Sequence, residues 1–87
     1  MKKVKVKVND GIGLHARTAS VFAKVATNFD CTVMVKGNGK IGNGKSMLTL
    51  MSLGIKSGMD IVIVTEGSDE EKALDKLSQL VENKFEL

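Results

Sequence analysis

The chain has 87 residues and a formal net charge of +3, and its 43% of hydrophobic residues suffices for a core without disulfide bonds. A chain of this length buries about 60 to 65% of its unfolded surface, so we expect a single domain over residues 1–87. The one cysteine, Cys31, excludes an internal disulfide, and no apolar run approaches the ~20 residues of a membrane span, which predicts a cytoplasmic protein without membrane insertion. Trp and Tyr are absent, so bases find little to stack on, and we expect no direct contact with nucleic acid.

The residue pattern in the first half of the chain predicts a strand, a helix and a hairpin. Valine and lysine alternate from Lys3 to Val8, which is typical of a strand with one apolar and one solvated face. Apolar residues then recur at helical spacing from Ala16 to about Asn28. Strands are predicted over Thr32 to Lys36 and around Lys40-Ile41, and Gly37-Asn38-Gly39 between them is a hairpin signal.

The second half predicts a short helix, a buried strand and a longer helix. Ser46 is a suitable N-cap for the apolar turn from Met47 to Leu53. The nearly continuous apolar run from Asp60 to Thr65 suits a central strand. Ser68 and Glu71 have the spacing of a capping box at the start of the last helix. The apolar stripe of that helix comprises Ala73, Leu74, Leu77, Leu80, Val81 and Phe85.

The predicted order of elements is β-α-β-β-α-β-α, without a linker or a repeat. This order favours a two-layer α+β domain, in which three helices cover one face of a four-stranded antiparallel sheet. The lysines of the first strand occupy the other face, which we expect to be open to solvent.

The only histidine, His15, lies directly before the predicted helix, within Gly13-Leu14-His15-Ala16-Arg17. Unpaired backbone N–H groups and the positive end of the helix dipole favour an anion at this position. Arg17 adds a forked set of donors that suits phosphate oxygens. The motif therefore indicates a histidine that carries a phosphoryl group, with a histidine that merely caps the helix as the alternative.

A second motif, Gly39 to Ser46, satisfies the phosphate-loop pattern G-x-x-x-x-G-K-[ST]. A nucleotide-binding protein would also need a parallel sheet and a carboxylate after another strand to hold magnesium. The best candidate strand, Ile61 to Val64, is followed by Thr65 and Glu66 with no aspartate in place. We therefore favour a hairpin followed by a serine-capped helix over a nucleotide loop.

From end to end, the chain resembles the histidine-containing phosphocarrier (HPr) family of the bacterial phosphotransferase system. The resemblance rests on the His15 motif and on the run from Lys45 to Ile55, which is similar to the second signature of the family. It implies an open-faced β-sandwich in which the fourth strand lies between the first and the second. It also implies a carrier for sugar transport rather than an autonomous enzyme. Enzyme I would pass a phosphoryl group from phosphoenolpyruvate to His15, and a sugar-permease component would receive it. We expect a monomer without a metal or cofactor, with Arg17 offsetting the phosphate charge.

The resemblance also implies a regulatory role for Ser46. In Gram-positive members the matching serine is phosphorylated by an ATP-dependent HPr kinase, which weakens acceptance from enzyme I and creates a corepressor for a catabolite-control transcription factor. A regulatory module that acts mainly through Ser46 is therefore the alternative function. The other interpretation of Ser46 is a plain N-cap.

Three apolar residues of the short helix, Met47, Leu48 and Met51, cannot all be buried, because a short helix buries only one stripe. They could form a docking surface for partners or pack as part of the core. The chain departs from the family at Thr18, where members usually have proline. We expect Thr18→Pro to be neutral or stabilising by up to ~1 kcal/mol.

Overall fold

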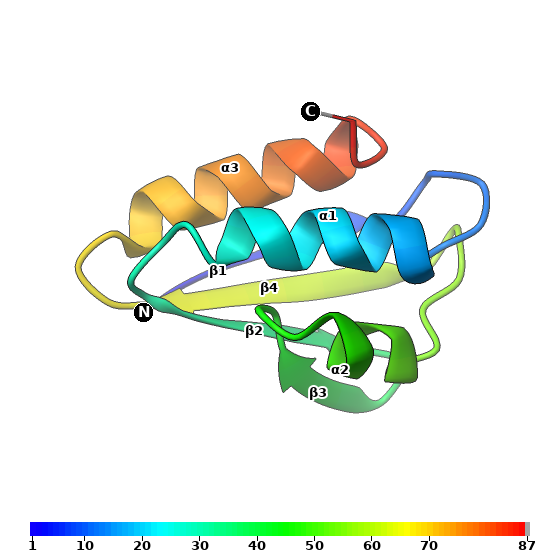
Figure 1. The fold of residues 1–87 in the computed structure, drawn as a ribbon, viewed down its shortest axis with the longest axis horizontal. Helices are drawn as coiled ribbons and strands as arrows, with labels where there is room; N and C mark the ends of the chain where they lie inside the picture. The colour runs from blue at the N-terminus through cyan, green and yellow to red at the C-terminus, as the bar shows by residue number, and fades with distance from the viewer. Residues whose placement is uncertain (87) are drawn as a thin grey trace.

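The computed structural model describes residues 1–86, which form a four-stranded sheet and three helices (Figure 1). In chain order the elements are β1 (Lys2–Lys7), α1 (Ala16–Ala26), β2 (Thr32–Gly37), β3 (Lys40–Asn43), α2 (Met47–Ser52), β4 (Asp60–Glu66) and α3 (Glu70–Glu82). The predicted element order is confirmed. Helix α1 is shorter than predicted, because the chain leaves the helix at Thr27.

The sheet is antiparallel throughout, with strands in the order β1-β4-β2-β3. The apolar strand β4 is central, and its Val62 lies opposite Lys5 of β1 and Lys36 of β2. This order confirms the open-faced arrangement that the family resemblance implies. The hairpin turn is confirmed at Asn38 and Gly39, which both have positive φ (54° and 75°), as a tight Asn-Gly turn requires.

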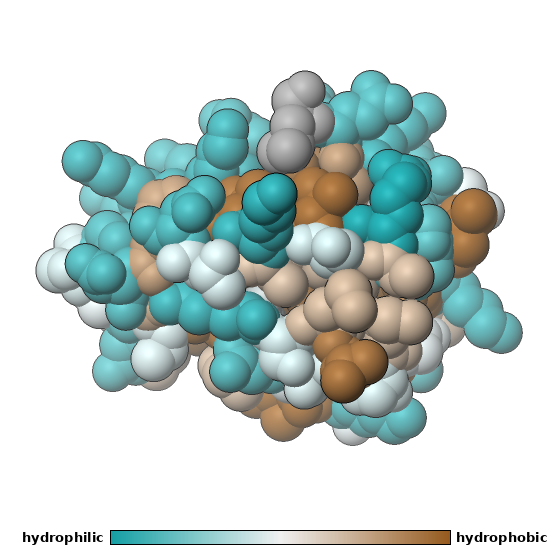
Figure 2. Space-filling view, viewed as in Figure 1, coloured by the Kyte–Doolittle hydropathy of each residue, from teal (hydrophilic) through white to brown (hydrophobic). Residues whose placement is uncertain are grey.

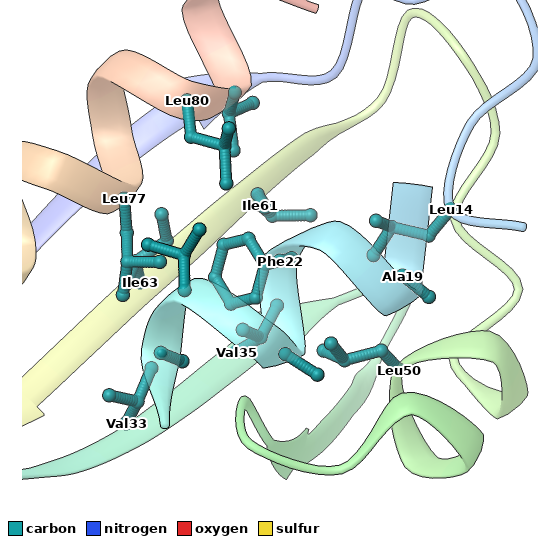
Figure 3. Close-up of a cluster of buried hydrophobic side chains, with 14 of the residues drawn as sticks. Leu14, Ala19, Phe22, Val33, Val35, Leu50, Ile61, Ile63, Leu77 and Leu80 are labelled. Atoms are coloured by element: carbon teal, nitrogen blue, oxygen red, sulfur yellow. The ribbon is translucent and has the colours of Figure 1, made fainter. Parts of the chain in front are cut away.

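The core lies between the sheet and the helices. Phe22 projects from α1 toward Val35 and Ile61 of the sheet, and Leu50 of α2 closes the core beside it (Figure 3). All four of these side chains are at most 1% exposed. Val35 and Ile61 therefore lie on the helix-covered face of the sheet, since side chains of a strand point alternately to opposite faces.

The opposite face of the sheet is open, as predicted. Lys3, Lys5 and Lys7 of β1 are exposed, whereas Val6 on the same strand is buried. Lys5 also forms a surface ion pair of 3.8 Å with Asp60 of β4. Within residues 1–86, no helix has the length and hydrophobicity needed to cross a membrane.

The predicted capping box at the start of α3 is wrong. The N-cap residue is Asp69 rather than Ser68, and its carboxylate accepts hydrogen bonds from Asp30 N (2.8 Å) and Cys31 N (2.9 Å). The helix therefore begins one residue later. Its entrance is stabilised by Glu70, whose Oε1 accepts from Gly67 N at 3.0 Å.

The phosphate-loop interpretation of residues 39–46 is also contradicted. Gly42 lies in β3, an antiparallel edge strand, and not in a loop that follows a parallel strand. A Cβ on Gly42 would meet Thr49 of α2 at 2.5 Å, and one on Gly44 would meet Val33 at the same distance. These glycines allow close packing of the hairpin, and the backbone around them is not free to surround a phosphate.

Candidate functional site

His15 is the N-cap residue of α1, with the extended backbone (φ −121°, ψ −171°) that such a position requires. The loop before it is held by the segment that precedes β4. Leu14 N donates to Ile55 O at 3.0 Å, and Gly13 forms a single bridge with Lys56. Gly13 has a φ of 112°, and a Cβ there would collide with the Ile55 carbonyl oxygen. The glycine of the motif is therefore needed to place His15.

Thr18 stabilises the first turn of α1 from within. Its side chain is fully buried, and its hydroxyl donates to Gly13 O at 2.8 Å and accepts from His15 N at 3.0 Å. The latter bond is one half of a capping box, in which a side chain of the first turn returns to the N-cap backbone. Thr18 therefore connects the loop, the histidine backbone and the helix.

The two nitrogens of the His15 ring have different surroundings. Nε2 is buried and lies 3.8 Å from Oδ2 of Asp10, whereas the side chain as a whole is 31% exposed. The Asp10 side chain is only 1% exposed. Because Nε2 is enclosed, Nδ1 is the nitrogen that remains for chemistry with a partner.

The start of α1 is suited to an anion. Its first turn contains no acidic residue, and the N–H groups of this turn have no intrahelical acceptor. Arg17 is exposed in this turn, and within residues 1–86 it forms no ion pair. Its guanidinium is therefore available to an anionic group on or near His15.

Helix α2 packs beside α1 and adds an apolar surface (Figure 1). Met47, Leu48 and Met51 are 37%, 74% and 38% exposed, and Figure 2 shows apolar side chains gathered over α2. The prediction that these three are not all core is confirmed. We call them the α2 apolar patch; a docking role for this patch stays a prediction.

Ser46 begins α2 as predicted. It is half-buried, and its hydroxyl oxygen accepts from Thr49 N at 3.3 Å. The preceding residue, Lys45, is anchored because its Nζ donates to Phe29 O at 2.6 Å. The structure thus places Ser46 directly before the α2 apolar patch, with its hydroxyl oxygen serving as the helix cap.

Asp10 is the site residue that sequence reasoning missed. The available signal was the turn Asp10-Gly11-Ile12-Gly13, in which an aspartate can accept from backbone N–H groups two and three residues later. Within residues 1–86, no group of three or more His, Cys, Asp and Glu residues is close enough to hold a metal ion.

Comparison with known proteins connects this geometry to a function. Residues 2–83 match the family model described as the PTS HPr component phosphorylation site. The chain is 46% identical over 83 residues to the phosphocarrier protein HPr of Mycoplasma pneumoniae, with 94% of each chain covered. It superposes on HPr from Thermoanaerobacter tengcongensis with a TM-score of 0.93, 39% identity and full coverage of both chains.

A third relative has a different designation. The structure of the catabolite-repression protein Crh from Bacillus subtilis, described as a dimer with a swapping domain, matches with a TM-score of 0.78 and 36% identity. The coverage is again complete for both chains.

Proposed function

The chain belongs to the HPr family of the phosphotransferase system, and we propose that within its single domain His15 is the residue that carries the phosphoryl group. The protein is a phosphoryl carrier of this system. One observation supports His15 above all: its side chain reaches solvent at an anion-favouring helix start, while Nε2 is enclosed against Asp10. The geometry therefore favours Nδ1 as the phosphorylated atom.

Two steps make up the proposed reaction. The lone pair of Nδ1 attacks the phosphorus of phosphorylated enzyme I, so that a P–Nδ1 bond forms while the bond from phosphorus to the donor breaks. In the second step, a nucleophile of the sugar-permease component attacks the same phosphorus and Nδ1 leaves. Arg17 and the N–H groups of the first turn offset the phosphate charge in both steps. This chemistry needs no metal or cofactor from this chain.

Incubation with enzyme I and phosphoenolpyruvate, followed by intact-mass measurement, tests the proposal. We expect one added phosphate, lost in acid and stable in base, as a phosphorus–nitrogen bond should be. Ser46→Ala is the control, because it removes a hydroxyl of the neighbouring helix and leaves the imidazole in place. A full-yield adduct on His15→Ala would contradict the role of His15, and an acid-stable adduct would indicate a hydroxyl as the acceptor.

The surface beside His15 is where we expect the partners to bind. Enzyme I and the sugar-permease component would dock in turn on the α2 apolar patch, beside the start of α1. The flexible side chains of Met47 and Met51 suit a surface that must fit unrelated partners. We propose that these encounters take place in the cytoplasm, with the carrier as a monomer. Light scattering of the purified protein would test the monomer against a domain-swapped dimer.

Regulation through Ser46 is the second candidate function. The similarity of this chain to Crh favours it. We propose that an HPr kinase transfers the terminal phosphate of ATP to the Ser46 hydroxyl and that the product binds a catabolite-control transcription factor. The positive end of α2 would favour the phosphate. Incubation with the kinase and Mg-ATP should yield an acid-stable adduct that Ser46→Ala abolishes and His15→Ala retains.

A further inference from the structure

The carboxylate of Asp10 is held rigidly by the loop before α1. Its Oδ1 accepts hydrogen bonds from Gly13 N at 2.6 Å and from Ile12 N at 3.3 Å. The same loop is tied to the rest of the molecule, because Gly11 N donates to Ser57 Oγ at 3.0 Å. The carboxylate therefore has a defined position and a defined orientation, although it lies in a loop.

The second oxygen of this carboxylate has no such partner. Oδ2 of Asp10 and Nε2 of His15 are the two buried side-chain polar atoms without a hydrogen bond in the part of the chain that the structure describes. They face each other at 3.8 Å, which is longer than a hydrogen bond. Burial of a carboxylate oxygen without a donor is costly. A proton on Nε2 would satisfy both atoms after a small rotation of the ring.

We infer that Asp10 is a positioning residue for His15: it keeps the ring proton on Nε2 and so keeps Nδ1 unprotonated. In the other neutral tautomer the lone pair of Nε2 would face the lone pairs of Oδ2, which is repulsive. The carboxylate therefore selects the tautomer in which Nδ1 is unprotonated. Hydrogen bonds at reactive sites are often long before the partner binds and shorten in the reacting complex.

The inference rests on the proposed function, in which Nδ1 is the phosphoryl acceptor. When the P–Nδ1 bond forms, Nδ1 supplies both electrons, no proton leaves the ring, and the imidazole gains positive charge. The Nε2–H group stays directed at Asp10, whose negative charge offsets that gain. Transfer onward returns the electron pair to Nδ1 and restores the neutral ring.

Asp10→Asn tests this assignment sharply, because it is nearly isosteric. The amide oxygen can still accept from Gly13 N, but the amide nitrogen then occupies the place of Oδ2 and donates toward Nε2. Nε2 must become an acceptor, so the ring proton should move to Nδ1, the reacting atom. Asp60→Asn is the matched control, since it removes the same charge from an exposed strand residue on the open face.

Nitrogen-15 NMR of labelled His15 at alkaline pH, where the ring is neutral, would measure the tautomer populations directly. We expect mainly the Nε2–H form in the wild type and in Asp60→Asn, and mainly the Nδ1–H form in Asp10→Asn. The rate of phosphoryl transfer from enzyme I should fall by about tenfold or more in Asp10→Asn only, because the ring is then mainly in the wrong tautomer. Thermal unfolding of each variant would verify that it is folded.

Three results would overturn the inference: a wild-type ring that is mainly Nδ1–H, equal tautomer populations in Asp10→Asn and wild type, or a changed tautomer with an unchanged rate. The wild-type measurement requires no variant, so a ring that is mainly Nδ1–H would overturn the inference even if Asp10→Asn does not fold. Failure of the proposed function gives a different result, since enzyme I would then not phosphorylate wild-type His15 whatever its tautomer.

Discussion

The buried hydroxyl of Thr18 donates a 2.8 Å hydrogen bond to the carbonyl oxygen of Gly13, across the loop that carries His15. The hydroxyl oxygen of Thr18 also accepts a hydrogen bond from His15 N at 3.0 Å, so one hydroxyl satisfies two backbone groups of the loop that ends at His15. The proline that usually occupies this position in the family cannot form either bond. A proline would stabilise this turn by restricting the backbone, whereas Thr18 stabilises it through side-chain hydrogen bonds.

We expect Thr18→Val to lower the free energy of unfolding by about 1 to 3 kcal/mol, because it leaves Gly13 O and His15 N without their partner. Thr27→Val is the control. The Thr27 hydroxyl donates to Lys24 O at 2.7 Å, but it is exposed and water can replace it, so its loss should cost at most ~0.5 kcal/mol. Urea unfolding of the three proteins would measure both differences. Equal stabilities of the two variants would show that burial of the Thr18 bonds contributes nothing.

The structure changes the expected effect of Thr18→Pro. Proline should gain up to ~1 kcal/mol from a less flexible unfolded chain, but it loses the two hydroxyl bonds, at about 1 to 3 kcal/mol. The sequence-based expectation of a neutral or stabilising change omitted the second effect. We now expect a net loss of about 1 kcal/mol in urea unfolding. A variant more stable than wild type would show that the family proline suits this loop better than the threonine.

Stability at low pH should depend on Asp69. Hydrogen bonds from the backbone N–H groups of Asp30 and Cys31 hold the pKa of the Asp69 carboxyl below its usual range. The charged form is therefore favoured by folding. Its contribution is complete above the unfolded-state pKa of about 3.9 and is lost as the pH falls through the lower, folded-state pKa.

Asp69→Asn should accordingly have a lower melting temperature than wild type, by a constant difference between about pH 5 and 7. The difference should narrow as the pH falls below about 4, because protonation then removes the same interaction from the wild type. Melting curves across this range provide the measurement, with Asp75→Asn, an exposed carboxylate on α3, as the control. A difference that stays constant down to pH 2 would contradict this assignment.

Removal of the Arg17 side chain should slow phosphoryl transfer without affecting the fold, because the residue is exposed. Loss of a charge-assisted contact to phosphate corresponds to a roughly 10- to 100-fold lower transfer rate in Arg17→Ala. Arg17→Lys should be intermediate, since lysine keeps the charge and loses the planar fork. Lys24→Ala removes an exposed cation from the last turn of the same helix and should have little effect. Equal rates for Arg17→Ala and Lys24→Ala would refute a specific role of Arg17.

Ser46→Asp should weaken docking of enzyme I and leave the fold intact. An aspartate can cap α2 as serine does, so we expect a stability change within about 0.5 kcal/mol. Its charge at the edge of the α2 apolar patch should raise the KM of enzyme I for this acceptor more than it changes kcat. Ser68→Asp places the same charge on the exposed loop before α3, at the far end of the molecule (Figure 1). Equal KM values for the two variants would separate Ser46 from the docking surface.

Local sequence patterns determined most of the fold. The alternation of valine and lysine predicted β1 with its open face, and the spacing of Ala19 and Phe22 predicted the buried side of α1. Asn38-Gly39 predicted the hairpin turn. Each of these signals depends on residues within a few positions of one another, where periodicity and backbone preference are sufficient. The same holds for His15 and Arg17, whose placement at the start of α1 follows from their own neighbours.

Contacts between distant segments decided the rest. Serine and aspartate are both suitable N-cap residues, so Ser68 and Asp69 could each begin α3. Asp69 is the N-cap in the structure because its carboxylate accepts from the backbone amides of Asp30 and Cys31, nearly 40 residues earlier. The environment of His15 depends in the same way on the segment before β4, which holds the loop and so brings the Asp10 carboxylate to Nε2. The sequence by itself predicted His15 as the reacting residue. Only the tertiary structure shows which ring nitrogen is enclosed, because that depends on where a buried carboxylate points.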